Sequence, residues 1–148
     1  MHGFNVLISK KAIKQQPHFC WKKPFDFQQK LALRTFSDEH IVVEQFTGTK
    51  FISEKLWLDN EDFFILTDGV ITNLKALCLE HKAANYDALL RKIVKEKSFF
   101  KNFRGHFVGF VYFKKEKTCI AFNNHTASKK LFYFADQNTI VIGTDLYT

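Results

Sequence analysis

The sequence predicts an α+β fold in which antiparallel strands dominate. Two observations lead to this prediction: β-type runs occupy both ends of the 148-residue chain, and two segments with helical periodicity lie between them. Because strands and helices do not alternate one by one, a doubly wound parallel sheet is not expected. With 46% hydrophobic residues and 18 Phe, the chain can bury one aromatic core. A single domain over residues 1–148 is therefore predicted.

Strands joined by turns are expected in the first half of the chain. Residues 2–9 form an apolar run, and residues 61–68 form another. The runs 40–47 and 50–58 lie on either side of a Gly-Thr pair, which predicts a hairpin. A short helix is expected over residues 27–35.

The second half is expected to begin with two helices and to end with four strands. Apolar residues at positions 71, 74, 77 and 78 repeat at helical spacing, which predicts a helix over 71–81. A second amphipathic segment predicts a helix over 86–96. The remaining strand-like runs are 105–113, 118–123, 131–135 and 139–143.

Composition narrows the class of protein. No run of 18 apolar residues occurs, so no membrane span is predicted. The N-terminal apolar residues precede Lys10 and Lys11, which is the reverse of the order in a signal peptide, so a cytoplasmic location is expected. Cysteines far apart in apolar surroundings favour buried free thiols and predict no metal site; they are Cys20, Cys78 and Cys119.

The net charge of +7 raises the alternative of a basic module that binds nucleic acid or an acidic partner. The Lys and Arg residues are dispersed in small groups, and no aromatic RNP pair or GXXG loop occurs. Nucleic acid is therefore not the expected partner, and the basic-module alternative stays open.

Four segments, in order, resemble motifs of one enzyme family. DGVITN (68–73) resembles NGEIYN, FRGHFVGFVY (103–112) resembles L.G.FAFALYD, NNHTASKKLFY (123–133) resembles RDRFGIKPLYY, and IGTDL (142–146) resembles FASEL. The chain thus resembles the N-terminal glutaminase domain of asparagine synthetases and other class II glutamine amidotransferases. The resemblance covers about residues 40–146 and the N-terminal strand. It implies a four-layer αββα sandwich with two antiparallel sheets, as in N-terminal-nucleophile (Ntn) hydrolases.

The resemblance also implies a glutamine-hydrolysing site whose catalytic parts are altered. The family's nucleophile is the Cys after the initiator Met, and its free α-amine handles the proton; His2 stands there instead. Since a residue as large as His2 hinders removal of Met1, no free α-amine is expected. Asp68 replaces the oxyanion-hole Asn beside Gly69, and an ionised carboxylate cannot donate a hydrogen bond.

Two substrate contacts of the family are altered as well. Lys55 stands where an Arg holds the α-carboxylate of glutamine, so the charge is kept but the bidentate fork is lost. Asn85 matches the Asp that holds the α-amine. We expect His2, Lys55, Asp68, Gly69 and Asn85 to surround one degenerate substrate pocket.

The expected function is that of a catalytically degenerate type II glutamine amidotransferase domain of an asparagine synthetase-like protein. Its expected role is scaffolding, interface or ligand sensing, without glutaminase activity, and altered chemistry at His2 is the enzymatic alternative. The family couples this domain to an ATP-binding synthetase domain, whose SGGxDS-type loop does not occur in residues 1–148. ATP and Mg are therefore expected only for such a domain, and no cofactor for this chain. Expected partners are a synthetase domain, a second copy of the chain or an amino-acid ligand.

Overall fold

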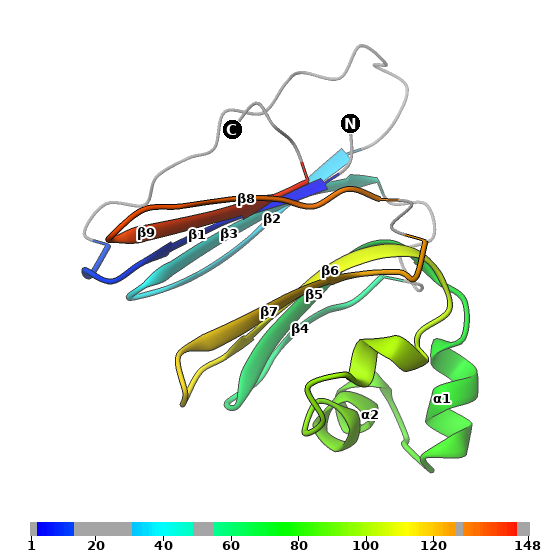
Figure 1. Cartoon of the computed structure of the whole chain (residues 1–148). Coiled ribbons are helices and arrows are strands. Elements are labelled where there is room, and N and C mark those ends of the chain that lie inside the picture. The colour runs from blue at the N-terminus through cyan, green and yellow to red at the C-terminus, as the bar shows by residue number, and fades with distance from the viewer. Residues whose placement is uncertain (1–2, 14–30, 49–54, 127–128, 145–148) are drawn as a thin grey trace. The chain divides into compact units, whose positions relative to one another are not determined.

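The computed structural model describes residues 3–13, 31–48, 55–126 and 129–144. The chain divides into two units, each built around one antiparallel sheet (Figure 1). The terminal unit comprises residues 1–52 and 131–148, and the central unit comprises residues 53–130.

The terminal unit contains a five-stranded sheet with the order β2-β3-β1-β9-β8. Its strands are β1 (Gly3–Ser9), β2 (Leu31–Asp38), β3 (Ile41–Gly48), β8 (Phe132–Ala135) and β9 (Thr139–Gly143). Val6 of β1 lies opposite Val43 on one side and Ile142 on the other. This confirms a central strand over the described part of the predicted 2–9 run. Successive side chains of a strand point to opposite faces of the sheet. Phe4 and Asn5 are both buried, so β1 is covered on both faces at this point.

Two predictions for the first half of the chain are corrected by the pairing of β3. The described part of the predicted 27–35 helix, from Leu31 onward, is strand β2, which pairs with β3 in register from Leu31–Gly48 to Asp38–Ile41. The predicted hairpin between 40–47 and 50–58 is also wrong. Both edges of β3 are already bonded, to β2 and β1, so residues 57–59 pair elsewhere. Residues 49–54 lie outside the described part.

The central unit contains a four-stranded sheet with the order β4-β5-β6-β7. Its strands are β4 (Trp57–Asp59), β5 (Phe63–Ile71), β6 (Gly105–Phe113) and β7 (Thr118–Asn123). The β5–β6 register runs from Phe63–Phe113 to Ile71–Gly105. The predicted strands 105–113 and 118–123 are confirmed, as is the turn between them.

The helices of the described chain are short and lie in the central unit: α1 (Leu74–Glu80), α2 (Tyr86–Ile93) and the 3-10 turn η2 (Phe99–Asn102). The predicted helix over 71–81 begins late because β5 continues to Ile71, held there by pairing with Gly105. The predicted helix over 86–96 ends at Ile93, with Val94 as its C-cap. Both helices exist at the predicted places but are shorter than predicted.

An aromatic cluster forms much of the core of the central unit. Phe122 of β7 lies with its ring centroid 5.5 Å from that of Phe99 and 6.2 Å from that of Phe107. Phe103 lies 5.8 Å from Phe107 and Phe100 stacks on Phe122. The high Phe content thus packs as edge-to-face and stacked pairs, geometries that aromatic quadrupoles favour.

The predicted four-layer αββα sandwich of the Ntn-hydrolase type is wrong for this structure. The structure is mostly β, with two antiparallel sheets but without the helical layers of that architecture. The described residues of the terminal unit contain no helix, and α1 and α2 have seven and eight residues. The physical reason is that residues predicted to be helical are extended by pairing with neighbouring strands, as at 31–35 and at Ile71.

Candidate functional site

Asp68 is a buried carboxylate in the sheet of the central unit. It lies on β5 opposite Val108 of β6, and its side chain is 2% exposed. Its Oδ2 lies 3.5 Å from Nζ of Lys129. Its Oδ1 has no hydrogen-bond partner within the described part of the chain. A buried charge without a partner is costly, so Lys129 is the group that makes an ionised Asp68 tolerable.

Gly69 leaves room for the contact between Asp68 and Lys129. It has φ +92°, in the region that favours glycine. A Cβ at this position would meet the carbonyl oxygen of His106 and would lie 2.9 Å from Cε of Lys129. The adjacent Asp68 and Gly69 thus form, with Lys129, one small charged site.

Lys129 was not among the residues predicted for this site. It lies far from Asp68 in the sequence, so periodicity could not join them. The sequence nonetheless contained a hint of this pair. A carboxylate inside an apolar strand such as 61–68 requires a nearby cation, and the Lys129-Lys130 pair before the apolar run that follows it offers one.

Lys55 lies near the same stretch of β5 through its backbone. The next residue, Leu56, donates its N–H to Oγ1 of Thr67 at 2.8 Å. The N–H of Thr67 in turn donates to the Leu56 carbonyl at 2.9 Å. Lys55 itself is half-buried. Its chain neighbour Leu56 thus bonds to Thr67, which is the chain neighbour of Asp68.

Asn85 has a local structural role at the start of α2. Its side chain accepts a hydrogen bond from the N–H of Ala88 at 2.8 Å, which is an N-cap contact. In the first turn of α2, Asp87 accepts a hydrogen bond from Asn60 at 3.0 Å. Asn60 also binds the N–H of Phe63, where β5 begins. The structure thus ties this end of α2 to the start of β5, whereas Asp68 lies further along that strand.

His2 lies outside the described residues, but the strand that follows it carries an unusual polar group. Asn5 of β1 is fully buried, and neither polar atom of its side chain has a hydrogen-bond partner in the described residues. It lies between Glu44 of β3 and Gly143 of β9. Buried amides are normally satisfied, so Asn5 is an exception that the alternation of the strand did not reveal.

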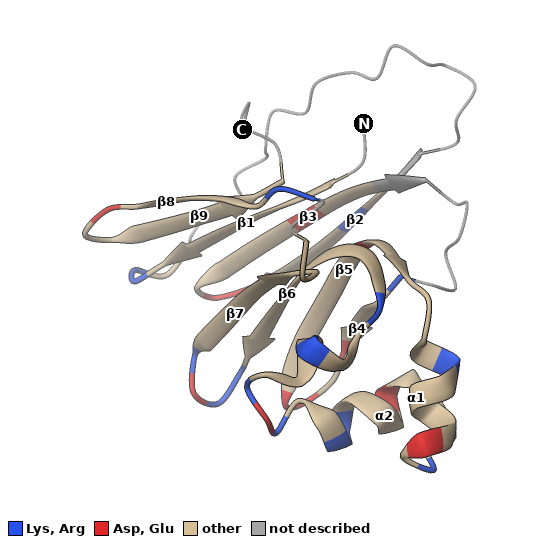
Figure 2. Cartoon of the chain, turned by 45° about the vertical axis from the view of Figure 1, so that its right-hand side comes forward, with Lys and Arg blue, Asp and Glu red and all other residues tan. Residues whose placement is uncertain are grey.

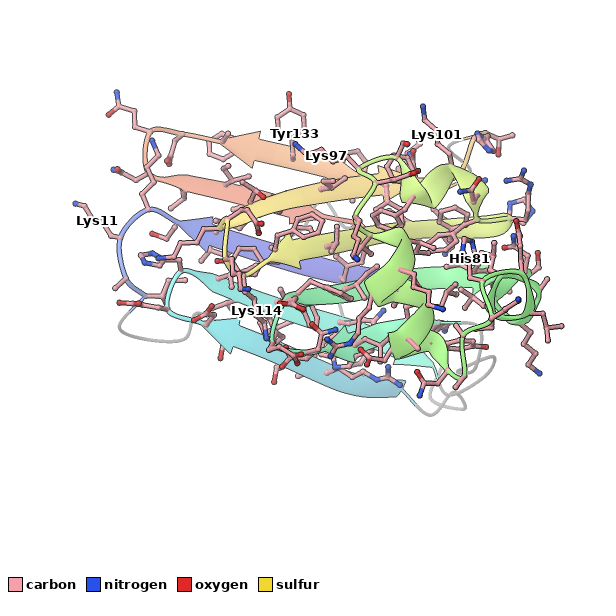
Figure 3. The ribbon with its side chains drawn as sticks, turned by 90° about the horizontal axis from the view of Figure 1, so that it is seen from below. Lys11, His81, Lys97, Lys101, Lys114 and Tyr133 are labelled. Carbon is pink, nitrogen blue, oxygen red and sulfur yellow. The ribbon has the colours of Figure 1, made fainter. Side chains whose placement is uncertain are left out.

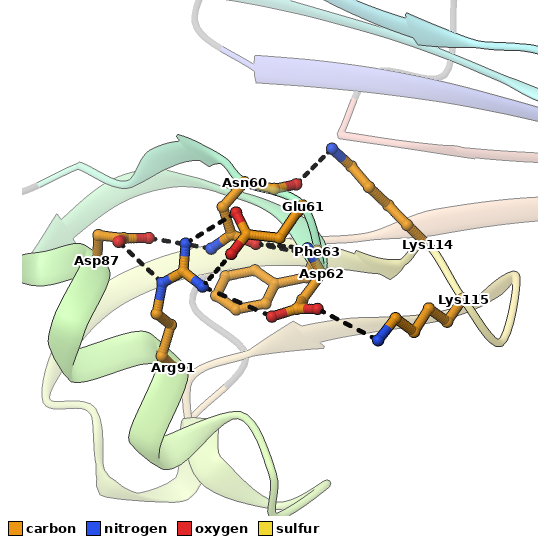
Figure 4. Close-up of polar contacts among 8 residues, drawn as sticks. All are labelled: Asn60, Glu61, Asp62, Phe63, Asp87, Arg91, Lys114 and Lys115. Carbon is orange, nitrogen blue, oxygen red and sulfur yellow. Dashed lines mark hydrogen bonds and ion pairs between the residues drawn. The ribbon is translucent and has the colours of Figure 1, made fainter.

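A second charged cluster surrounds Arg91 of α2 (Figure 4). The guanidinium of Arg91 binds both carboxylate oxygens of Glu61, at 2.8 and 3.1 Å, and Oδ2 of Asp87 at 2.9 Å. The hydrogen bond from Arg91 lowers the pKa of Glu61 to about 2. Hydrogen bonds from Asn60 and then from Arg91 lower the pKa of Asp87. The arrangement keeps these acids ionised and attaches α2 to the start of β5.

The same cluster extends to the turn between β6 and β7, where charges of both signs gather (Figure 2). Lys114 binds Asp59 and the carbonyl of Asn60. Asp62 lies 3.5 Å from Arg91 and 3.9 Å from Lys115. These charges are largely matched against one another, which is typical of a structural clamp.

A cavity of about 530 Å³ opens beside the Arg91 cluster. It lies between the segment after α2 and the β6–β7 hairpin. Its lining mixes apolar and charged side chains: Asp62, Phe63, Arg91, Val94, Lys95, Lys97, Phe113, Lys115, Glu116, Thr118, Cys119 and Ile120. The size falls within the range of about 300–1,000 Å³ typical of small-molecule sites.

The described chain holds no group of three or more His, Cys, Asp or Glu side chains placed to bind a metal ion. Within the described ranges, no helix has the length and apolar character needed to cross a membrane. No protein-family model matches the sequence, and no curated protein matches it either.

Proposed function

We propose that this chain is a catalytically degenerate type II glutamine amidotransferase domain of an asparagine synthetase-like protein, with a ligand-sensing or interface role. The observation that carries the proposal is Asp68. Where the family has an amide that donates to an oxyanion, this chain has a buried carboxylate paired with Lys129 at 3.5 Å. The proposal rests on this site and on the order of the motifs, and not on a four-layer architecture.

Electrostatics opposes hydrolysis at Asp68. Attack on an amide carbonyl places negative charge on its oxygen, and a neighbouring carboxylate in a poorly solvated place raises the energy of that charge. Loss of one oxyanion donor alone lowers the rate by about 10²–10³-fold. The Lys129 ammonium offers little compensation, because Asp68 already holds it.

The backbone at the motif glycines supports the proposed relationship. Gly69 and Gly105 have φ values of 92° and 128°, which side chains rarely adopt. Both belong to segments that resemble family motifs, and they lie near one another at the ends of β5 and β6. The resemblance therefore falls on positions where the backbone requires glycine.

The proposal includes a cytoplasmic location and particular partners. Cys78 and Cys119 are free thiols, which suits a reducing compartment. The partners proposed are a synthetase domain or a second copy of the chain, and the ligand proposed is an amino acid. In such an assembly, a domain that binds without hydrolysing would report the presence of its ligand.

A glutaminase assay with the intact chain tests the proposal. We expect no ammonia release from glutamine above the buffer rate, and a mass that retains Met1. His2→Cys alone should stay inactive, because effects within one catalytic unit do not add and Asp68 still opposes the oxyanion. Activity should require His2→Cys together with Asp68→Asn and removal of Met1.

The opposite result has a clear signature. Glutamine hydrolysis by the unmodified chain that is lost in His2→Ala, but kept in the control His125→Ala, would overturn the proposal. It would assign His2 as the nucleophile or the base.

A further inference from the structure

The cavity beside α2 has an apolar floor that remains open to solvent. Phe63 and Val94 are 2% and 7% exposed and belong to the core cluster of the central unit. Phe113 and Ile120 pack against that cluster but are only partly buried. The edge of the core is thus uncovered where the cavity opens.

The charges around this floor are unevenly matched. Arg91 and Lys115 face Asp62 within ion-pair distance, so these lining charges offset one another. Lys95 and Lys97 follow α2, are exposed, and make no ion pair within the described chain. Lys97 extends from this segment in Figure 3. Two lysines that make no ion pair with a described residue therefore lie at the rim of an apolar floor.

We propose that this cavity binds a small organic anion with an apolar body. Its carboxylate pairs with Lys95 and Lys97, and its hydrocarbon or aromatic part lies on Phe113 and Ile120. The charge of these lysines selects an anion, and the floor selects an apolar body. A cavity of about 530 Å³ holds one small molecule.

This site is separate from the one at Asp68. Phe63 and Ile65 of β5 point into the core cluster that includes the helices. Side chains alternate along a strand, so Asp68 points to the opposite face of the sheet. Along β5 the two positions are five residues apart, or roughly 16 Å. The inference therefore stands or fails independently of the glutaminase resemblance.

Ile120 provides a built-in reporter of occupancy. It lines the cavity and its side chain packs on the core cluster, so a molecule on the floor would change the chemical shifts of its methyl groups. Ile71, at the other end of β5 from Phe63, does not line the cavity, which makes it the internal control.

The experiment titrates the intact chain with octanoate and follows the methyl resonances of Ile120 and Ile71 by NMR. Octanoate has about ten heavy atoms, and a Kd of about 1 mM is expected for a ligand of that size. It should shift the Ile120 resonances until they saturate and leave those of Ile71 unchanged. Octylamine, which has the same body and the opposite charge, and acetate, which lacks the body, should shift neither.

Charge variants test the roles of the rim residues, with circular dichroism to confirm folding. Lys95→Glu with Lys97→Glu should weaken octanoate binding by about 10-fold or more. Glu116→Gln should tighten it by about twofold, because an unpaired like charge leaves the rim. Lys101→Glu, outside the cavity, should change it less than about twofold.

Three outcomes would overturn the inference. One is an equal shift of the Ile120 resonances by octanoate and octylamine, which would remove the selection for anions. Another is no shift of Ile120 at any octanoate concentration below its micelle threshold. The third is a change at Ile120 with anionic phospholipid vesicles but not with free octanoate, which would make the surface a lipid-binding face instead.

Discussion

At the scale of single residues, Asp68 poses the sharpest electrostatic problem in the central unit. Only one of its oxygens has a described partner, and that partner, Lys129, has a side chain that is 38% exposed. Removing one member of a buried ion pair usually costs more than removing both, because the remaining charge is left in a poor solvent. The exposure of Lys129 reduces the effect, since water screens its side of the pair.

The residue-scale prediction concerns Lys129→Met. We expect a loss of about 1–3 kcal/mol in the free energy of unfolding, because Asp68 is left buried without a cation. In an Asp68→Asn background the same change should cost less than about 1 kcal/mol. Urea denaturation measures all three variants.

The matched control for this prediction is Lys130→Met at the exposed neighbouring position. It should change the unfolding free energy by less than about 0.5 kcal/mol. Equal losses in the Lys129 and Lys130 variants would show that the Asp68 contact contributes nothing to stability.

At the scale of secondary-structure elements, α2 is held by groups at its ends. Asn85 caps its first turn, Asp87 lies in that turn, and Arg91 and Lys92 lie in the last turn. This arrangement satisfies free backbone donors and complements the helix dipole.

The start of α1 is fixed differently. Asn73 makes no capping bond and instead donates to the Asn102 carbonyl and accepts from the N–H of Arg104.

The element-scale prediction follows from the contact of α2 with Glu61. The folded pKa of Glu61, about 2, is lower than its ordinary value of 4.5. Its stabilising contribution is therefore fully present above about pH 4.5 and is lost as pH falls towards 2. Arg91→Gln should return the Glu61 titration towards 4.5, as measured by NMR of the side-chain carboxyl.

Stability measurements should show the same sign. The unfolding free energy of the unmodified chain should fall more steeply between pH 4.5 and 2 than that of Arg91→Gln. Arg104→Gln is the control, because the guanidinium of Arg104 donates to the backbone carbonyls of Lys101 and Phe103. A Glu61 titration near 4.5 in the unmodified chain would refute the clamp.

At the scale of the whole molecule, each unit depends on its own sheet. The terminal unit needs both ends of the chain, since β1 pairs with β9 from Asn5–Gly143 to Ser9–Thr139. The central unit is continuous in sequence, and its core includes aromatic rings from η2, β6 and β7. Phe122 is 3% exposed and lies near four other Phe rings.

The prediction at this scale is that Phe122→Ala destabilises the chain by about 3–5 kcal/mol, because it leaves a cavity in the aromatic cluster. Phe134→Ala is the matched control. Phe134 is 64% exposed, so its loss should change the unfolding free energy by less than about 0.5 kcal/mol. Similar losses in both variants, measured by denaturant unfolding, would contradict the assigned core.

Local signals in the sequence determined much of the element order. The runs 105–113, 118–123 and 139–143 are strands as predicted. Such strands can be recognised from their own alternating or apolar residues and from the turns beside them, without information on distant residues. The adjacency of Asp68 and Gly69 and the existence of both helices were also readable. The start of α1 was not, because pairing with Gly105 keeps Ile71 in strand β5.

Only the tertiary structure decided which strands are partners and which charges meet. β3 pairs with β2 and β1 and not with residues 50–58, and Lys129 reaches Asp68 across a long stretch of sequence. The cavity likewise combines side chains from β5, the segment after α2 and the β6–β7 hairpin. The periodicity of a segment determines which face its side chains occupy. The strand pairs, the Lys129–Asp68 pair and the cavity depend instead on hydrogen bonding and packing between segments that are distant in sequence. For that reason short segments can resemble the motifs of a family while the αββα sandwich predicted from that resemblance is wrong.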